Sequence, residues 1–232
     1  MIKHHPTFEL LKSFVNGDLP ASLAAGVAIH ADMCQECQQK IAQLTEQVAE
    51  TSFEFEEQFL DRFIVDEQEI QPENIEVEDS FDEMIASITA SKAVELQQPK
   101  TEKMVSFNDN TYVLPTALNH MQLDKAMHIG KLSRARIQLD EDEIHTSLLH
   151  MAPGGSVPEH THKGFELTLL LDGSFEDANG KYVKGDFIML DKKHHHHPVS
   201  HEGCLCYTVA NDALHFTQGI NKLLNPIGSF IY

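Results

Sequence analysis

The sequence predicts a multidomain protein of the α plus all-β class, in which a small helical bundle precedes a closed β-barrel. Apolar residues recur at helical spacing through most of the first 95 residues, whereas strand-like alternation punctuated by Gly and Asp begins near Met104. The 232 residues are 41% hydrophobic, enough for two ordinary domains. We expect a helical domain at 1–95, a linker at 96–103 and a β domain at 104–232.

The first forty residues predict short helices. Phe8, Leu11 and Phe14 share one helical face, Gly17 and Asp18 form a break, and a second helix begins near Pro20. A third apolar run passes through Ile41, Leu44 and Val48 at a spacing of three to four residues.

The segment 50–80 changes character, because it is strongly acidic and has Arg62 as its single base. A solvated, partly disordered connection is the favoured interpretation, and a docking segment the alternative. A further helix follows, since Ser80 and Glu83 have capping-box spacing. Its apolar stripe needs a partner, which is either the bundle or another protein, and consists of Phe81, Met84, Ile85 and Ile88.

Several features point to a barrel or sandwich after residue 104. The run 167–171 is apolar on both faces, as in a strand buried on both sides, and Asn179-Gly180 is a hairpin signal. Cys204 and Cys206 share one face of a strand, and small buried side chains are favoured over a redox pair. Closed β architecture fits this pattern best.

The formal net charge of -19 argues against a direct nucleic-acid partner. Residues 1–100 hold twenty Asp and Glu against six Lys and Arg, so a basic protein is the expected partner of this half. No stretch has the length and apolar character of a membrane span, and the N-terminus lacks the pattern of a signal peptide. We expect a cytoplasmic protein. Its oligomeric state is not predicted.

His30, Cys34 and Cys37 are spaced i, i+4 and i+7, so their side chains leave one helical face and its end toward a common point. Structural zinc takes four N or S ligands, so a fourth must come from elsewhere. His4 and His5 are the nearest supply. We favour His5 because it precedes Pro6 and should be extended, although the spacing does not separate the two. Structural zinc is expected here ahead of a redox CxxC pair.

A second set follows the pattern Gly154, His160, His162, Glu166, Gly173. Positions 160, 162 and 166 have the same parity, so on one strand their side chains would share a face. His196, eleven residues after Gly185, is expected to supply a fourth ligand from a neighbouring strand. Within the run 194–197, that spacing and strand register select it. Such a site could hold zinc, manganese, iron or nickel. His145, His150 and His201 lack comparable spacing and are expected to be ordinary surface or packing residues.

The segments HHP at 4–6, HxxxCxxC at 30–37, PGGSVPEHTHKGFELTLLLDGSF and HHPVSHEGCLCYTVANDA together resemble the ChrR-type zinc-binding anti-sigma factors, over nearly the whole chain. The resemblance implies an N-terminal zinc domain that binds an ECF-type sigma factor and a C-terminal cupin domain. It implies a response to singlet oxygen or organic peroxides. It also implies zinc ligands His5, His30, Cys34 and Cys37, and cupin ligands His160, His162, Glu166 and His196.

Three functions remain in competition, the blandest of which is a storage or structural cupin with a zinc-stabilised extension and no partner. The first is a non-enzymatic regulator, in which the acidic N-terminal domain inhibits a sigma factor and the cupin mediates release by oxidant. On this hypothesis residues 1–100 alone should inhibit, and removal of the cupin should abolish release. The second is a metal-dependent cupin enzyme, a dioxygenase or isomerase, with a zinc-stabilised extension, although no catalytic residue stands out.

Overall fold

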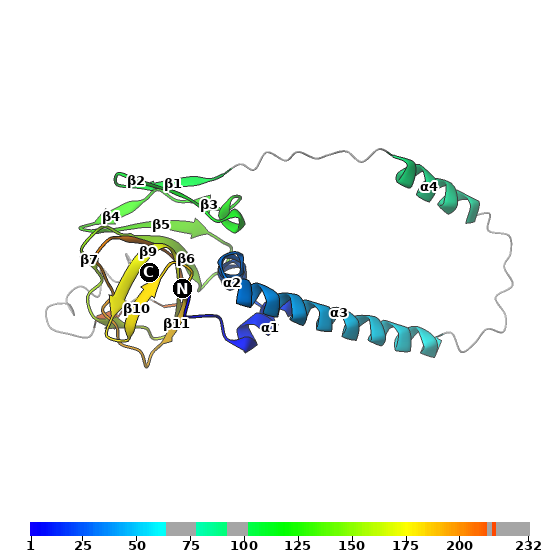
Figure 1. Cartoon of the computed structure of the whole chain (residues 1–232), viewed down its shortest axis with the longest axis horizontal. Coiled ribbons are helices and arrows are strands. Elements are labelled where there is room, and N and C mark those ends of the chain that lie inside the picture. Colours follow the sequence, from blue (N-terminus) through cyan, green and yellow to red (C-terminus); the bar gives the residue numbers. More distant parts are fainter. Residues whose placement is uncertain (64–77, 92–101, 213–214, 217–232) are drawn as a thin grey trace. The chain divides into compact units, whose positions relative to one another are not determined.

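The N-terminal part of the chain is helical, as expected. The computed structural model describes residues 1–63, 78–91, 102–212 and 215–216, and everything below concerns these residues. The helices are α1 (Phe8–Asn16), α2 (Ala21–Met33), α3 (Gln35–Phe63) and α4 (Glu78–Ala90) (Figure 1). None of them combines the length and the apolar character needed to cross a membrane.

Local signals explain the start and end of α1. The side chain of Thr7 accepts a hydrogen bond from the backbone N of Leu10, and so caps the first turn. Gly17 ends the helix in the left-handed conformation at φ 76°, which costs a glycine little. The chain then turns at Pro20 into α2, which ends where Cys34 takes an extended conformation.

Two expectations for the acidic region were wrong in detail. The first part of the presumed connection, 50–63, continues α3 as helix, because the spacing that starts at Ile41 is not interrupted by Gly or Pro. The helix with the apolar stripe begins at Glu78, so Ser80 lies inside it and is not its cap. Residues 64–77, the rest of the expected connection, lie outside the described residues. The four apolar side chains of α4 are exposed.

The second half is a cupin-like β structure. The described strands are β1 (Met104–Phe107), β2 (Asn110–Val113), β3 (Gln122–Leu123), β4 (Met127–Ile129), β5 (Leu132–Gln138), β6 (His145–Met151), β7 (Gly155–Ser156), β8 (His160–Thr161), β9 (Phe165–Asp177), β10 (Gly180–Val183), β11 (Phe187–Asp191), β12 (Val199–Ser200), β13 (Cys204–Ala210) and β14 (His215–Phe216), with a 3-10 turn η1 at Thr116–Leu118. The fold class expected from the sequence is thereby confirmed.

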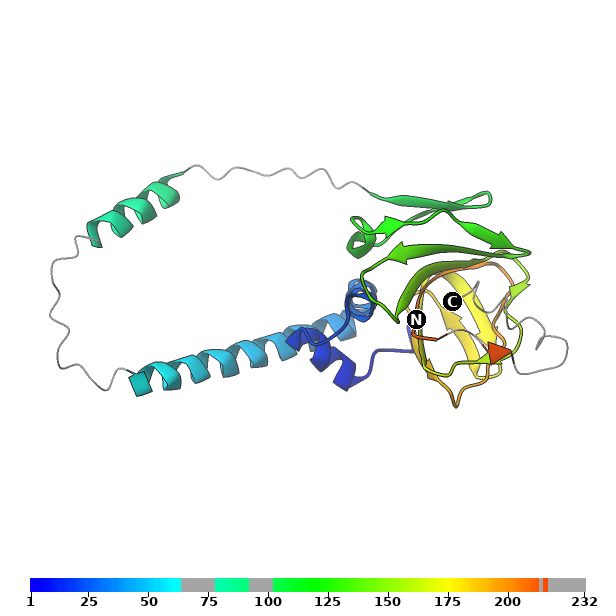
Figure 2. The ribbon, with the colours of Figure 1, turned by 180° about the vertical axis from the view of Figure 1, so that it is seen from behind.

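All strand pairs are antiparallel, and the largest sheet runs in the order β3-β5-β6-β13-β9-β12-β7. β11 and β10 pair with successive parts of the long strand β9. The hairpin between β9 and β10 occurs where expected, but its two loop residues are Ala178 and Asn179, since Gly180 already pairs with Asp177. This curled sheet surrounds the interior seen end-on in Figure 2.

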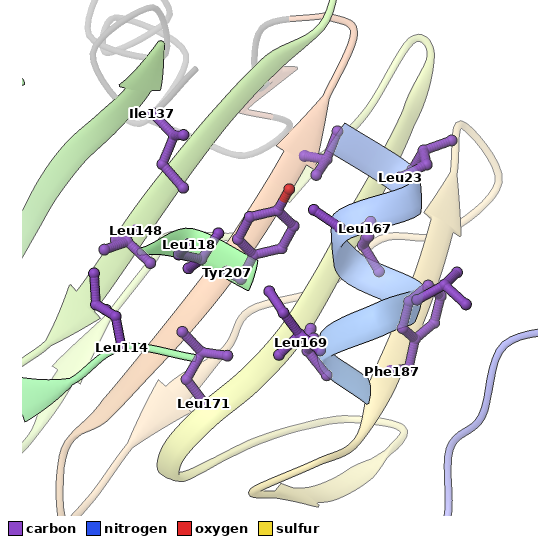
Figure 3. Close-up of a cluster of buried hydrophobic side chains, with 14 of the residues drawn as sticks. Leu23, Leu114, Leu118, Ile137, Leu148, Leu167, Leu169, Leu171, Phe187 and Tyr207 are labelled. Carbon is purple, nitrogen blue, oxygen red and sulfur yellow. The ribbon is translucent and has the colours of Figure 1, made fainter. Parts of the chain in front are cut away.

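The chain divides into two compact units, 1–48 with 102–232, and 49–101. This division does not follow the expected boundary near residue 96, because the first helices pack on the barrel. α2 is apolar on every side, as is usual for a helix buried on several faces. Figure 3 shows it against Leu167, Leu169 and Phe187 of the sheet.

The contact between α2 and the barrel requires Gly26. A Cβ atom at this position would lie 2.7 Å from Cδ2 of Leu167 and 3.4 Å from Cε1 of Tyr207. Both of these side chains are fully buried. The helix backbone therefore lies directly on β9 and β13, and this places the end of α2 beside the turn between β10 and β11.

Candidate metal centres

The first cluster gathers four side chains from four places in the N-terminal region. His5 comes from the segment before α1, His30 from the last turn of α2, Cys34 from the break that follows and Cys37 from the first turn of α3. The break matters, because the extended conformation of Cys34 redirects the chain into α3, which carries Cys37. One potential ligand atom from each residue lies within 4.8 Å of all the others.

The distances in this cluster suit a tetrahedral ion. Nε2 of His30 lies 3.3 Å from Sγ of Cys37, and Nδ1 of His5 lies 3.4 Å from Sγ of Cys34 and 3.5 Å from Sγ of Cys37. In a tetrahedral zinc site with ordinary bond lengths, N and S ligands are about 3.6 Å apart. The soft donor set and its near-complete burial therefore fit zinc.

The proton position on His30 also fits. Its Nδ1 donates to the carbonyl oxygen of Gly185 at 2.8 Å, and a carbonyl can only accept. The lone pair of the neutral ring is therefore on Nε2, which faces the cysteines. Burial lowers the pKa of His30, so the neutral form is favoured. Burial and the charge of Cys34 raise the pKa of Cys37 to about 12. A bound cation would have the opposite effect and would favour the thiolate.

The second cluster lies inside the barrel and contains all four residues expected there. His160 belongs to β8, His162 to the turn after it, Glu166 to β9, and His196 to the segment before β12. The assumption that the first three share one strand was wrong, because the chain turns at Lys163 and Gly164 between β8 and β9. Convergence comes instead from the turn and from backbone bonds between His160 and His196, each N to the other O at 3.1 Å.

The four side chains of the second cluster point at one another. Nε2 of His196 lies 2.8 Å from Nε2 of His160 and 3.3 Å from Nε2 of His162. Oε2 of Glu166 lies 3.0 Å from Nε2 of His162, yet this buried oxygen accepts no hydrogen bond of acceptable geometry within the described residues. Such a buried, unsatisfied carboxylate oxygen is costly unless a cation meets it.

Protonation favours a cation at the second cluster as well. Nδ1 of His160 donates to the carbonyl of Pro158 at 2.8 Å, which leaves its Nε2 lone pair directed toward His196. Burial, together with His196, lowers the pKa of His160 to about 3. Burial alone would raise the pKa of Glu166, but the three histidines outweigh it and hold that pKa at about 2. Neutral imidazoles and an ionised carboxylate are the forms that bind metal.

Only one member of the 194–197 run joins the cluster, as expected. His196 is buried, whereas His194, His195 and His197 are exposed. Asp191 shapes the turn before it by accepting hydrogen bonds from the backbone N of Lys193 at 2.9 Å and from the His194 ring at 2.8 Å. The turn thus leaves His194 and His195 in solvent and directs His196 inward.

A small cavity of about 30 Å³ adjoins the second cluster. It reaches His160, Glu166 and His196, and its other walls are mainly apolar. Cys206 also lines it, and Sγ of Cys206 is 4.0 Å from Sγ of Cys204. Both cysteines are buried free thiols, as expected of small buried side chains. The volume suits one or two water-sized molecules.

Two groups near the clusters were missed by sequence reasoning. The carbonyl of Gly185 binds His30, and the carboxylate of Asp177 lies 3.8 Å from Nδ1 of His196, on the side away from the other ligands. Gly185 served only as a spacing marker in the sequence. The burial of Asp177, whose side chain is 2% exposed, had no signal in the sequence. Of the other histidines, His145 is half-buried and His201 is exposed, but His150 is buried.

Comparisons with known proteins find one family model and several similar chains. Residues 109–213 match the model of the ChrR cupin-like domain. The chain is 25% identical, over 97% of its own length and 97% of the relative, to the anti-sigma-E factor ChrR of Cereibacter sphaeroides. It superposes with a TM-score of 0.58 and 24% identity on a chain in the crystal structure of Rhodobacter sphaeroides SigE in complex with the anti-sigma ChrR, covering 90% of this chain and 99% of that one. Residues 109–213 are thus a cupin-like domain of the ChrR type, and the chain as a whole resembles a ChrR-type anti-sigma factor.

Proposed function

We propose that this protein is an anti-sigma factor that binds and inhibits an ECF-type sigma factor through its N-terminal zinc module. The chain is similar to an anti-sigma-E factor over 97% of its length. The observation that carries the proposal is that this chain has both a strongly acidic helical region and a cluster of four potential zinc ligands, His5, His30, Cys34 and Cys37. An acidic surface complements the basic surfaces of a protein that works on DNA. The protein works in the cytoplasm, where its partner is.

Zinc is the metal proposed for the first cluster. Four N and S donors leave no position open, which is typical of structural zinc. Its role is to hold the segment before α1, the end of α2 and the start of α3 in one arrangement. The second cluster is proposed to hold zinc or another divalent ion of the manganese, iron or nickel group.

The cupin domain is proposed to mediate release of the sigma factor in response to oxidative signals such as singlet oxygen or organic peroxides. The cavity beside His160, Glu166 and Cys206 has room for singlet oxygen or for the peroxide group of a hydroperoxide. The alternative, a dioxygenase or isomerase, would require a place for an organic substrate. The cavity of about 30 Å³ is too small for one, and the hollow of about 440 Å³ nearby is lined by His196 but by none of the other three ligands.

Binding is tested by co-expressing the full chain with its cognate sigma factor and measuring co-purification and bound metal. Cys37→Ser should lose one metal and the sigma factor together, because the buried thiolate cannot be replaced by a hydroxyl. Cys204→Ser is the matched control, a buried cysteine outside both clusters, and should lose neither. Failure of the wild-type chain to co-purify with any sigma factor of the same cell would refute the proposal.

Release is tested by exposing the purified complex to an organic hydroperoxide or to a photosensitiser under light. His160→Ala should keep the sigma factor bound under both treatments, since it removes a cupin ligand and leaves the first cluster intact. His201→Ala, an exposed histidine bonded to Glu176, should release it like the wild type. Release of equal extent from all three proteins would show that the second cluster does not sense the oxidant.

A further inference from the structure

The turn between β10 and β11 in the barrel binds the segment that carries His5. Oδ1 of Asp186 accepts hydrogen bonds from the backbone N of Lys3 at 2.7 Å and of His4 at 3.0 Å. The backbone N of Phe187 then donates to the carbonyl of His4 at 3.0 Å. Three hydrogen bonds therefore fix the backbone immediately before His5, and all of them come from one corner of the cupin domain.

Asp186 is fully buried, and both of its carboxylate oxygens are engaged. Oδ2 accepts from the backbone N of Val183 at 2.8 Å and so closes the turn itself, while Oδ1 is directed to the N-terminal segment. A single side chain thus ties the shape of the turn to the position of residues 3 and 4. Charge-assisted hydrogen bonds of this kind are stronger than neutral ones and are sensitive to geometry.

Gly185, the preceding residue, contacts His30 of the first cluster and lies beside Ile2 of the N-terminal segment. Its carbonyl oxygen fixes the ring of His30, as described above. Its own conformation, φ 92°, favours glycine, and a Cβ atom here would collide with the side chain of Ile2. The absence of a side chain at this position leaves room for Ile2 and so for the N-terminal segment over the turn.

We propose that Gly185 and Asp186 are positioning residues of the first metal site, so that the cupin domain supplies the outer shell for two of its four ligands, His5 and His30. The inference rests on the proposed binding of zinc by this cluster. It goes beyond that proposal, because the metal affinity of the N-terminal module would depend on the turn between β10 and β11 of the cupin domain. Groups that hold metal ligands in place without binding the metal themselves commonly contribute about 10- to 100-fold to metal affinity.

Cobalt(II) added to the metal-free, reduced full-length protein is the probe. Thiolate-to-cobalt charge-transfer absorption reports the first site alone, because the second cluster contains no cysteine. Total bound cobalt minus the first-site signal reports the second site, and competition with a chelator gives the affinity of each. The two sites are therefore read separately in one sample, and neither readout requires a sigma factor.

Asp186→Asn is the first variant. Its amide can present only one oxygen, so an N–H group must face either the N–H groups of Lys3 and His4 or that of Val183. We expect cobalt affinity at the first site to fall by about 10- to 100-fold, with a shifted charge-transfer band, and the second site to be unchanged. Asp172→Asn is the control, because this exposed carboxylate pairs with Lys184 at 3.7 Å and does not touch the N-terminal segment.

If Asp186→Asn also loses metal at the second site, the barrel itself is damaged. Lys3→Pro then tests whether the contact with the N-terminal segment is what supports the first site. The proline removes one N–H donor to Asp186 and leaves every cupin residue intact, while Lys3→Ala keeps that donor and removes only an exposed side chain. First-site affinity should fall for Lys3→Pro and stay at the wild-type value for Lys3→Ala. Wild-type affinity and an unshifted band in Lys3→Pro would overturn the inference.

Discussion

The hydroxyl of Tyr207 on strand β13 donates a 2.7 Å hydrogen bond to the carbonyl oxygen of Ser22 in the first turn of α2. Both residues are fully buried, and they are 185 positions apart in the sequence. Together with the bond from His30 to Gly185 at the other end of the helix, this contact attaches α2 to the barrel at both ends. The helix that carries one metal ligand is thus part of the cupin core.

The first prediction concerns that bond. Tyr207→Phe keeps the ring and removes the hydroxyl, so the carbonyl of Ser22 loses a partner in a dry environment. The free energy of unfolding should decrease by about 1 kcal/mol, the usual contribution of such a bond. Urea unfolding followed by circular dichroism measures it. An unchanged midpoint would mean that α2 is not docked through this residue in solution.

The second prediction concerns the closeness of α2 to the sheet. Gly26→Val should destabilise the protein by about 1–3 kcal/mol, because the added side chain must displace Leu167 or Tyr207 from a packed core. Ala21→Val, on an exposed position of the same helix, is the matched control and should have little effect. Thermal unfolding of the two variants compares them directly, and equal melting temperatures would contradict the docked arrangement.

The sequence was informative about the ligands because metal sites need particular side chains at particular spacings. Helical spacing brought His30, Cys34 and Cys37 together on paper, and the structure brings them together in space. The second set was found for a partly wrong reason. Parity along one strand was assumed, whereas Lys163 and Gly164 turn the chain between β8 and β9. Spacing identified these residues, but it did not describe the backbone that joins them.

The packing of the helices on the barrel could not be predicted in the same way. α2 shows apolar residues on every face, which indicates burial on more than one side but does not identify the second neighbour. The contacts of Asp186 depend on backbone N–H groups of Lys3 and His4, and backbone groups leave no mark in a sequence. The helical extent of 50–63 was missed because acidic composition was given more weight than spacing.

The third prediction is a pH dependence caused by His150 on β6. This ring is 1% exposed, stacks on Phe107 and lies near Tyr112, and neither ring nitrogen has a hydrogen-bond partner within the described part of the chain. Burial, and then the charge of His128, lower its pKa below the ordinary value of 6.5. The unfolded chain therefore binds a proton near pH 6.5 that the folded chain does not yet bind.

Protonation of His150 therefore does not affect the free energy of unfolding well above pH 6.5. As the pH falls below 6.5, the free energy of unfolding decreases by up to about 1.4 kcal/mol per pH unit. His150→Phe keeps an aromatic ring against Phe107 and cannot be protonated. Urea unfolding at pH 7.5 and at pH 5.5 should show a smaller loss of stability for this variant than for the wild type. Parallel losses in the two proteins would show that His150 is not buried as a neutral ring.

The fourth prediction follows from strand β11, which lies between the two clusters. One end adjoins Gly185 and Asp186, and near the other end Leu190 pairs with Glu166 of β9. Leu190 is buried and Met189 beside it is 38% exposed, so the strand offers a matched pair of truncations. Leu190→Ala leaves a cavity next to Glu166 and loosens the strand, whereas Met189→Ala removes a side chain on the opposite face.

If β11 connects the two sites mechanically, Leu190→Ala should weaken cobalt binding at both, even though Leu190 is a ligand of neither. The first-site loss should be roughly 2- to 30-fold, which corresponds to a coupling of about 0.5–2 kcal/mol. Met189→Ala should leave both affinities at the wild-type value. If cobalt affinity fell only at the second site, the turn between β10 and β11 would position His5 and His30 without transmitting structural changes from the barrel. The oxidant signal would then need another route to the N-terminal module.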